Sequence, residues 1–387
     1  MKILYIITQG ELGGAQKYVL SLIAEAKNRN FETALASGDN DQDSWLKQEA
    51  GILNCPTTVL KYLKREISPL ADLQAVWEMA KLYKKVQPDI IHLNSTKAGV
   101  IGSLAFLFYR LPTAKLIYTA HGWVFNEELP KLKKLLYLYL EKFTALIKDK
   151  IICVSKFDRQ AGLKHKISSP KKLITIHNGV EFADDYFFSQ AEARARFNLS
   201  PDEKVIGTVA NFYPTKGLKY LITAVGILKQ ANLPIKTVII GDGELRPELE
   251  QQIKELNLES EVILAGRIEN GERYLKAFDL AVMPSVKEGL PYFALGVLSA
   301  GLPIIATKVG GLPEIIEDGV NGLLVASKNP EQLAEAIKQL LNNPDLKEKM
   351  KSNNPQKITE QFSLKQMTEK TFTIYQEPFN TSTGLMC

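Results

Sequence analysis

Short apolar runs alternate with helix-like patterns through the first half of the chain. The first run, residues 2–8, is followed by a glycine-containing loop and then by apolar residues at helical spacing, such as Tyr18, Leu22 and Ala26. A strand, a glycine loop and a helix in that order are typical of the start of a Rossmann-like unit. Similar runs predict further strands at residues 32–37, 89–93, 115–120, 150–154 and 172–176. Because these runs are almost continuously apolar, we expect a parallel sheet covered on both faces.

The same alternation starts again after a polar stretch at residues 181–201, where we place the domain boundary. Strands are predicted at residues 204–210, 236–241, 261–266, 279–285 and 303–307. The fold class is therefore α/β, with an N-terminal Rossmann-like domain of residues 1–185 and a second, doubly wound domain of residues 186–362. A C-terminal helix within residues 363–387 is expected to pack back on the first domain, followed by a tail. Open α/β sheets bind ligands at the carboxyl ends of their strands, so we expect the active site in a central cleft that the two domains face.

The composition excludes several classes of protein but does not indicate an activity. The 387 residues are 45% hydrophobic and 24% charged, and the net charge of +5 is too small and too dispersed to indicate a nucleic-acid partner. Cys55, Cys153 and Cys387 are far apart, which disfavours a zinc site or a disulfide framework and fits a reducing cytoplasm. The N-terminal apolar run is too short for a signal peptide, and the longest apolar stretch, residues 99–109, is too short to cross a bilayer. We therefore expect a cytoplasmic protein.

Residues 284–311 carry the most informative chemistry. A predicted strand ends at Ser285, Glu288 lies in the turn, Gly289 lets the backbone approach a ligand, and Pro291 suits the first turn of the next helix. Unpaired amides at a helix start stabilise a phosphate, and a nearby carboxylate accepts hydrogen bonds from sugar hydroxyls. This combination suits a sugar that is bound to a nucleotide diphosphate.

The same segment resembles the signature of the family 4 glycosyltransferases. The resemblance extends over nearly the whole chain, through GELGGAQ, AHGW, HNGVEF, PTKG, GDGELRPEL, EGLP and AGLPIIAT, followed by Gly310 and Gly311. It implies the GT-B fold and a retaining, metal-independent transfer of a hexose or related sugar from a nucleotide diphosphate sugar, a UDP- or GDP-sugar, to a hydroxyl acceptor. It also implies that the N-terminal domain holds the acceptor and the C-terminal domain holds the donor, with no separate cofactor.

The resemblance implies catalytic roles for three residues. Glu288 would contact the hydroxyls of the donor sugar, Lys216 would stabilise the departing nucleotide diphosphate, and His121 would support the reacting face of the sugar. Each has an ordinary alternative: Glu288 as a helix-initiating acid, Lys216 as a solvated lysine, and His121 as a structural histidine. No enzymic nucleophile stands out, so we expect the leaving phosphate itself to accept the proton of the acceptor.

Substrate-binding roles are implied for Gly13, Gly14, Asn211, Arg267, Ile268, Gly289, Leu290 and Gly296. The amides of Gly13 and Gly14 could reach a donor phosphate, although a glycine pair is more often only a tight loop. Arg267 and Ile268 would lie near the base or the diphosphate of the donor. For Arg267, an ordinary surface position without a binding role is almost as well supported. No residues are expected to bind a metal.

Two positions depart from the family pattern. Gly296 occupies the place of a second glutamate that holds the ribose, and Asn211 occupies the place of an arginine on the pyrophosphate. A hydrogen bond to a charged group is worth about 1.5–3 kcal/mol, so its loss would weaken donor binding roughly ten- to hundredfold unless another group substitutes. The alternative function is therefore a non-catalytic or weakened protein that binds a sugar nucleotide.

Two further segments leave alternatives open. The acidic cluster at residues 39–43, with the sequence DNDQD, could suggest a metal site, but a solvated loop is favoured. Residues 128–150 predict a helix with an apolar stripe, including Leu132, Leu136, Tyr139 and Phe143, and with lysines elsewhere. We favour packing of this stripe on the sheet; the alternative is peripheral contact with the inner face of a membrane, which would indicate a lipid-linked acceptor. Either way, a role in cell-envelope glycan or glycolipid assembly is expected.

Overall fold

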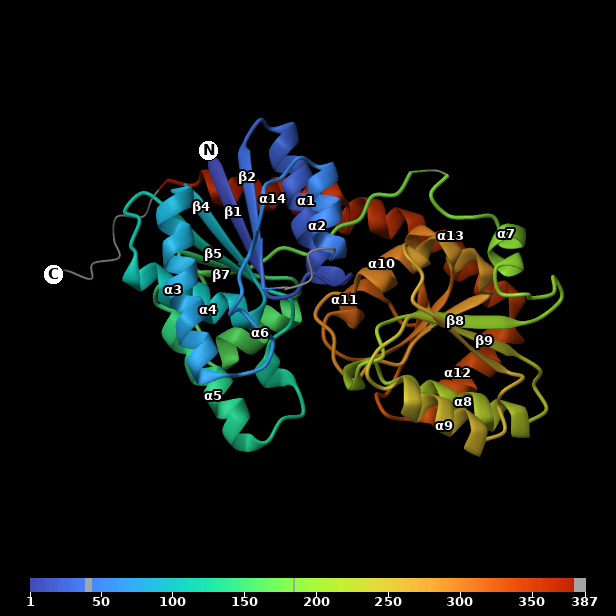
Figure 1. Ribbon diagram of the computed structural model, residues 1–387. Helices are drawn as coiled ribbons and strands as arrows, with labels where there is room; N and C mark the ends of the chain where they lie inside the picture. The colour runs from blue at the N-terminus through green and yellow to red at the C-terminus, as the bar shows by residue number, and fades with distance from the viewer. Residues whose placement is uncertain (39–43, 184, 379–387) are drawn as a thin grey trace. The chain divides into compact units, whose positions relative to one another are not determined.

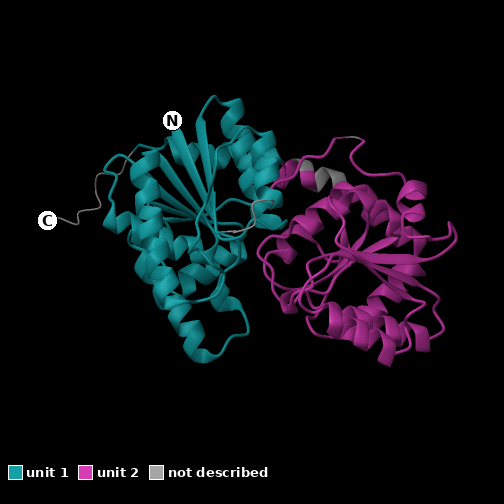
Figure 2. Cartoon of the chain, in the orientation of Figure 1, with its two compact units in different colours: residues 1–178, 364–387 teal, residues 179–363 magenta. Residues whose placement is uncertain are grey.

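The computed structural model describes residues 1–38, 44–183 and 185–378, so the acidic residues 39–43 lie outside the described part of the chain. Two compact units divide the chain (Figure 2). Unit 1 comprises Met1–Asn178 together with the chain from Leu364 onward, and unit 2 comprises Gly179–Ser363. Within the described residues, none of the helices is both long enough and apolar enough to cross a membrane.

Unit 1 is built on a seven-stranded sheet with the strand order β3-β2-β1-β4-β5-β6-β7, all neighbours being parallel. The strands are β1 (Lys2–Ile7), β2 (Glu32–Ser37), β3 (Thr57–Val59), β4 (Ile90–Asn94), β5 (Lys115–Ala120), β6 (Lys150–Cys153) and β7 (Leu173–Thr175). The apolar runs predict all of them except β3. That strand has three residues at the edge of the sheet, where exposed threonines replace the apolar run of a buried strand.

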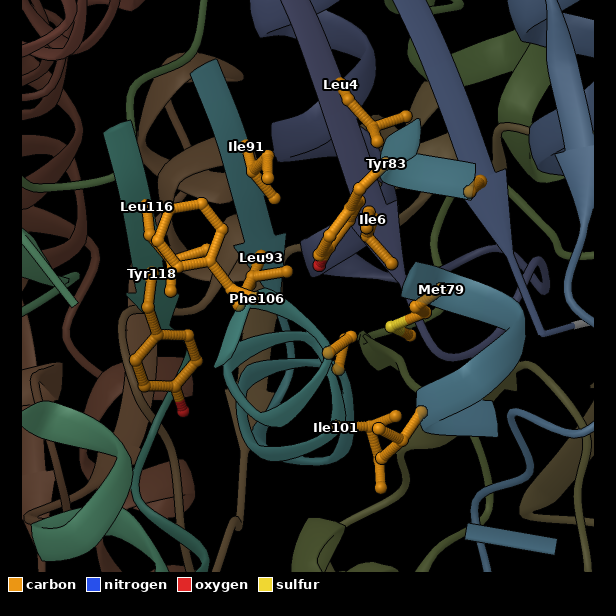
Figure 3. Close-up of a cluster of buried hydrophobic side chains, with 14 of the residues drawn as sticks. Leu4, Ile6, Met79, Tyr83, Ile91, Leu93, Ile101, Phe106, Leu116 and Tyr118 are labelled. Atoms are coloured by element: carbon orange, nitrogen blue, oxygen red, sulfur yellow. The ribbon is translucent and has the colours of Figure 1, made fainter. Parts of the chain in front are cut away.

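The helices of unit 1 are α1 (Gly14–Asn28), α2 (Trp45–Ile52), α3 (Pro69–Val86), α4 (Thr96–Phe108), α5 (Lys131–Ala145), α6 (Lys156–Lys164) and α14 (Leu364–Gln376), with a 3-10 turn η1 (Val124–Asn126) (Figure 1). On one face of the sheet, α3 and α4 pack against alternate strand residues (Figure 3). The labelled side chains of this cluster are Leu4, Ile6, Met79, Tyr83, Ile91, Leu93, Ile101, Phe106, Leu116 and Tyr118. Each fully buried apolar side chain contributes about 1.5–3 kcal/mol relative to an exposed one.

The opposite face of the sheet in unit 1 is covered by α1 and α14. Side chains alternate along a strand, so Tyr5 and His92 point away from the cluster of Figure 3. The hydroxyl of Tyr5 donates a hydrogen bond to the carbonyl of Leu22 in α1. The ring of Phe372 in α14 stacks on Phe31, with 5.9 Å between the ring centroids. The C-terminal helix is therefore part of the core of unit 1.

Unit 2 holds a six-stranded parallel sheet with the order β10-β9-β8-β11-β12-β13. The strands are β8 (Val205–Val209), β9 (Lys236–Ile240), β10 (Val262–Gly266), β11 (Leu280–Met283), β12 (Ile304–Thr307) and β13 (Gly322–Val325). The helices are α7 (Gln190–Ala195), α8 (Leu218–Gln230), α9 (Arg246–Glu255), α10 (Tyr292–Ser299), α11 (Leu312–Ile315), α12 (Pro330–Leu341) and α13 (Pro344–Gln361), with 3-10 turns η2 (Pro214–Lys216) and η3 (Gly271–Ala277). The four-residue β13 is the strand that the sequence pattern misses. The predicted organisation of two α/β units with parallel sheets is confirmed.

Candidate active site

Two loops of unit 2 meet at the carboxyl edge of its sheet. Since β8 and β11 are neighbouring strands, the loops that follow them lie side by side. The carbonyl of Thr215 accepts a hydrogen bond from the amide of Val286 at 2.8 Å. Gly217 has a positive φ of 63°, and a Cβ added to it would come within 2.1 Å of the carbonyl oxygen of Pro284. The loops are therefore fastened together by backbone contacts that leave no room for a side chain at Gly217.

This contact joins two of the predicted catalytic residues. Nζ of Lys216 lies 2.7 Å from Oε1 of Glu288, and the hydroxyl of Ser285 donates to the same oxygen at 2.7 Å. The Glu288 side chain is buried, whereas Lys216 is partly exposed. Oε2 of Glu288 makes no hydrogen bond to any residue that the structure describes. The arrangement thus combines a fixed carboxylate that can still accept hydrogen bonds with a cation that can face an anion.

A third loop holds the Glu288 turn from behind. Gly310, after β12, has a φ of 54°, and an added Cβ would come within 1.9 Å of the carbonyl oxygen of Glu288. The amide of Gly311 donates to the carbonyl of Gly289 at 2.8 Å. Gly289 and Leu290 are both buried in this turn. The predicted substrate-binding turn is therefore clamped in one conformation before any ligand arrives.

Asn211, Arg267 and Ile268 follow other strands at the same edge of the sheet. Asn211 comes just after β8 and is half-buried, while Arg267 is exposed and Ile268 half-buried after β10. One strand, β9, lies between β8 and β10, so their loops begin about 10 Å apart. The structure places these residues along the edge that carries Lys216 and Glu288, without a direct contact to that pair in the interactions described.

Gly296 is placed differently from the residues above. It lies buried inside α10, and a Cβ added to it would contact Leu275 at 3.6 Å and Phe182 at 3.8 Å. Phe182 belongs to an aromatic group, with its ring centroid 4.8 Å from that of Tyr186 and 5.1 Å from that of Phe187. The position therefore faces apolar side chains, and the structure does not bring it to the Lys216–Glu288 pair.

In unit 1, the two predicted phosphate-binding glycines begin α1. Gly13 is the residue that caps the helix, it supplies no capping side chain, and the first turn contains no acidic residue. Gly14 is exposed at the first helical position. The first-turn amides of a helix have no partner within it and carry partial positive charge. This end of α1 can therefore accept an anion, and its own first turn supplies no carboxylate that would compete for it.

His121 follows β5 at the same edge of the sheet and packs against α1. Its ring meets the ring of Tyr18 edge to face, with 4.9 Å between centroids, and its buried Nε2 has no hydrogen-bond partner in the described part of the chain. Burial lowers the pKa of His121 to about 3, so the ring is neutral near pH 7. A neutral imidazole with an unpartnered nitrogen can make a hydrogen bond to a sugar hydroxyl.

A chain of buried polar groups supports His121. The hydroxyl groups of Tyr18 and Thr119 lie 3.2 Å apart, and Nε2 of His92 lies 2.7 Å from the Thr119 oxygen. Burial, together with the nearby His121, lowers the pKa of His92 to about 3. The sequence alone assigns no catalytic or binding role to His92 or to Tyr18. The only signal available was the helical position of Tyr18, four residues after Gly14.

Comparison with known proteins identifies the family. Residues 12–184 match the family described as Glycosyltransferase Family 4, and residues 189–357 match the one described as Glycosyl transferases group 1. The UDP-Gal:alpha-D-GlcNAc-diphosphoundecaprenol alpha-1,3-galactosyltransferase of Escherichia coli is 27% identical over 383 residues, which cover 97% of this chain and 96% of that enzyme. An uncharacterised glycosyltransferase of Methanocaldococcus jannaschii is 31% identical over 294 residues, covering 75% of each chain. The chain belongs to the family 4 glycosyltransferases.

Solved structures agree on the fold of this glycosyltransferase. Anabaena HepE, crystallised with UDP and glucose, superposes with a TM-score of 0.83 at 22% identity, over 97% of this chain and all (100%) of that one. The sucrose-phosphate synthase of Thermosynechococcus elongatus gives a TM-score of 0.83 at 21% identity, over 97% and 98% of the two chains. The predicted GT-B fold is confirmed.

Sequence reasoning missed the residues that hold the Glu288 side chain and its turn in place. Ser285 donates to Glu288, and its own carbonyl accepts from the hydroxyl of Thr307 at 2.5 Å. Ser285 ends a predicted strand three residues before Glu288, which was the available signal for a contact with it. Gly310 was quoted as part of the family signature but was given no role. The substrate roles of the predicted residues themselves stay predictions.

Proposed function

We propose that this glycosyltransferase moves a hexose or related sugar from a nucleotide diphosphate sugar to a hydroxyl acceptor, with retention at the anomeric carbon and without a metal. The observation that carries the proposal is the Lys216–Glu288 pair, held at 2.7 Å at the carboxyl edge of a Rossmann-like sheet. Glu288 orients the donor sugar through its unpartnered oxygen. Lys216 stabilises the negative charge that grows on the diphosphate as the glycosidic bond breaks.

The proposed step is a front-face displacement. The acceptor oxygen bonds to the anomeric carbon while the bond from that carbon to the phosphate oxygen breaks, and the acceptor proton passes to the departing phosphate. The departing diphosphate keeps the electron pair of the broken bond and is stabilised by Lys216. For unit 1 the proposed roles are a hydrogen bond from neutral His121 to the donor sugar and amide contacts from Gly13 and Gly14 to a phosphate.

The relatives support more specific proposals for donor and acceptor. The Escherichia coli relative is named for UDP-Gal and for a diphosphoundecaprenol-linked acceptor, and Anabaena HepE binds UDP-glucose in its crystal structure. A Staphylococcus aureus relative, 26% identical over 333 residues, is named for capsular polysaccharide biosynthesis. We therefore propose a UDP-sugar donor, a lipid-linked glycan acceptor and a role in cell-envelope glycan assembly, with peripheral contact between the enzyme and a membrane.

Gly296 favours a second candidate, a weakened or non-catalytic protein that binds sugar nucleotides. This position supplies no carboxylate for the ribose, and the side chains it faces, Leu275 and Phe182, are apolar. Gly296→Glu separates the two functions when donor affinity is measured by calorimetry. A ten- to hundredfold gain in affinity would support the weakened site, whereas unchanged affinity with measurable turnover would support a transferase that holds the ribose by other groups.

The main experiment combines binding with turnover. A nucleotide that binds the folded protein raises its melting temperature in proportion to the logarithm of its concentration, so UDP, GDP and their sugar conjugates are compared by thermal shift. We expect UDP and a UDP-sugar to stabilise the protein, and transfer to a polyprenyl diphosphate sugar to continue in a chelator. The anomeric configuration of the product, read by NMR, tests retention. Absence of any nucleotide shift would overturn the proposal.

A further inference from the structure

Three consecutive helices of unit 1 expose an unusual number of large apolar side chains. On α5 these are Leu132, Leu135, Leu136, Tyr139, Phe143 and, just after its end, Leu146. Their spacing of three and four residues places them on one face of the helix. Leu132 is 81% exposed and Tyr139 is 64% exposed. The favoured prediction, in which this stripe packs on the sheet, is therefore wrong.

The stripe faces outward because a polar group fixes the other side of α5. Glu141 is buried, accepts a hydrogen bond from the hydroxyl of Tyr118 at 3.0 Å and pairs with the buried ammonium of Lys148 at 3.2 Å. Tyr137 and Leu138 pack against the core of unit 1 on the same side. Rotating the helix to bury its apolar stripe would expose this ion pair and break its contacts. The orientation is therefore built into the fold.

The neighbouring helices also expose large apolar side chains. Contacts join α5 to α4 and α4 to α3, so the three lie side by side. Leu70 and Trp77 of α3 are 81% and 52% exposed, and Phe108 at the end of α4 is 59% exposed. The rings of Trp77 and Phe108 meet with 5.2 Å between their centroids. We call the exposed apolar side chains of α3, α4 and α5 the three-helix surface.

The exposed charged residues within α5 itself are basic, although Glu128, three residues before the helix begins, is also exposed. Lys131, Lys133, Lys134 and Lys142 lie on this helix, and its single acidic residue is Glu141, which is buried and paired. The first six residues of α5 are all exposed, so three of the lysines stand beside Leu132, Leu135 and Leu136 with nothing covering them. Exposed leucines flanked by lysines are typical of helices that lie in the interface of an anionic bilayer.

We infer that the three-helix surface docks on an anionic lipid membrane. A protein partner is disfavoured because interfaces between proteins are depleted in lysine, whereas lysine stems extend along a bilayer interface and place their charge among phosphates. Trp77 and Tyr139 are of the types that gather at the boundary between headgroups and acyl chains. Only the purpose of this docking, which is to bring the site to a lipid-linked acceptor, rests on the proposed function.

Vesicle binding tests the charge of the surface with the full-length protein. The probes are vesicles of phosphatidylcholine alone and of phosphatidylcholine mixed with phosphatidylglycerol, at low salt. We expect the wild type to bind only the anionic vesicles. In the triple variant Lys131→Glu, Lys133→Glu and Lys134→Glu, we expect the affinity for these vesicles to fall at least about a hundredfold. A matched control with the same change in net charge, Lys254→Glu, Lys338→Glu and Lys349→Glu, replaces exposed lysines of unit 2 and should bind nearly as wild type.

A second pair of variants tests the apolar part. Leu132→Ser with Leu136→Ser should weaken vesicle binding at least tenfold. The control is Ile52→Ser with Leu256→Ser, two exposed apolar residues outside the surface. Because all four side chains are exposed, we expect unchanged melting temperatures, which confirms that each variant folds.

The outcomes separate this inference from the proposed function. Vesicle binding does not require turnover, and transfer to a short water-soluble acceptor should be equal in wild type and in the surface variants. Equal vesicle binding by the surface variants and their controls would overturn the inference, as would failure of the wild type to bind anionic vesicles. A dimer in solution that Leu132→Ser with Leu136→Ser dissociates would also overturn it, in favour of a second copy of this chain on the surface.

Discussion

The phenol oxygen of Tyr375 lies 2.5 Å from Nδ1 of His92 and links α14 to β4 across 283 positions of the chain. Both side chains are buried, and the other ring nitrogen of His92 contacts Thr119. Since water does not reach these atoms, each depends on its partner inside the protein. The C-terminal helix therefore completes a polar network that continues through Thr119 and Tyr18 to the ring of His121.

Replacing Tyr375 by Phe should destabilise the protein. The change keeps the ring but leaves Nδ1 of His92 buried without a partner, which costs about 1–3 kcal/mol of unfolding free energy. Urea denaturation, followed by circular dichroism, measures the loss. Tyr139→Phe is the matched control, because that hydroxyl belongs to a side chain that is 64% exposed, and it should change little. Equal stability of the two variants would show that the link contributes nothing.

Stability should fall in mild acid because two histidines are held neutral. Burial lowers the pKa of His92 and of His121 to about 3 in the folded protein, whereas an unfolded histidine has a pKa near 6.5. Below about pH 6.5 the unfolded state therefore binds protons that the folded state does not. Their stabilising contribution is complete above that pH and is lost progressively as the pH falls toward 3, by up to about 1.4 kcal/mol per pH unit for each histidine.

Urea denaturation at several values between pH 7 and pH 5 measures this dependence. His92→Gln should flatten the slope, because one of the two histidines no longer titrates. His177→Gln, outside the buried network, is the control. A slope that is the same in wild type and His92→Gln would rule out the assigned cause.

The sequence predicts most strands of the two sheets but not the contacts between their loops. Continuous apolar runs give nearly every strand, since a parallel strand buried on both faces must be apolar throughout. They do not give the strand order, and the meeting of Lys216 with Glu288 depends on it. These residues are 72 positions apart and touch because β11 inserts beside β8. The family resemblance names both residues without indicating that they form an ion pair.

Helix α5 shows a second kind of limit. Its apolar stripe is evident in the sequence, but a stripe alone does not tell whether it faces the core or the outside. The orientation depends on Glu141, which has the appearance of a surface acid until Lys148 and Tyr118 are seen around it. The link from His92 to Tyr375 is equally hidden, because no local pattern relates residues so far apart in the chain.

Lys216→Ala should reduce turnover strongly. If this ammonium stabilises the leaving diphosphate, its loss lowers kcat by roughly 10²–10³, as for other preorganised electrostatic groups. The matched control is Lys219→Ala, an exposed lysine on the following helix, which should leave kcat unchanged. Melting temperatures check that any loss does not come from unpairing the buried Glu288. Undiminished transfer by a folded Lys216→Ala protein would contradict the assignment.

Gly310→Ala should damage the site through the backbone of Glu288. Its φ of 54° disfavours any side chain, and the new Cβ would lie 1.9 Å from the Glu288 carbonyl oxygen, so the turn must move. Gly319→Ala is the control: its φ is 75°, but an added Cβ meets nothing within 4 Å. Both variants carry the conformational cost of about 1–2 kcal/mol, and only Gly310→Ala should also raise the KM for the donor. Equal donor KM values would show that the clamp does not position Glu288.

Gly296→Ala should stabilise unit 2, because a glycine inside a helix costs up to about 1 kcal/mol relative to alanine. The added Cβ makes ordinary contacts with Leu275 at 3.6 Å and Phe182 at 3.8 Å. Gly226→Ala in α8 has similar room, with Leu256 at 3.6 Å, and should raise the free energy of unfolding by a similar amount. Gly102→Ala in α4 is the opposite case, since its Cβ would lie 2.5 Å from Leu93, and it should destabilise the protein. Destabilisation by Gly296→Ala would contradict this prediction and would indicate that the packing at this position requires a glycine. Because alanine adds no group that can bind the donor, the test concerns stability alone.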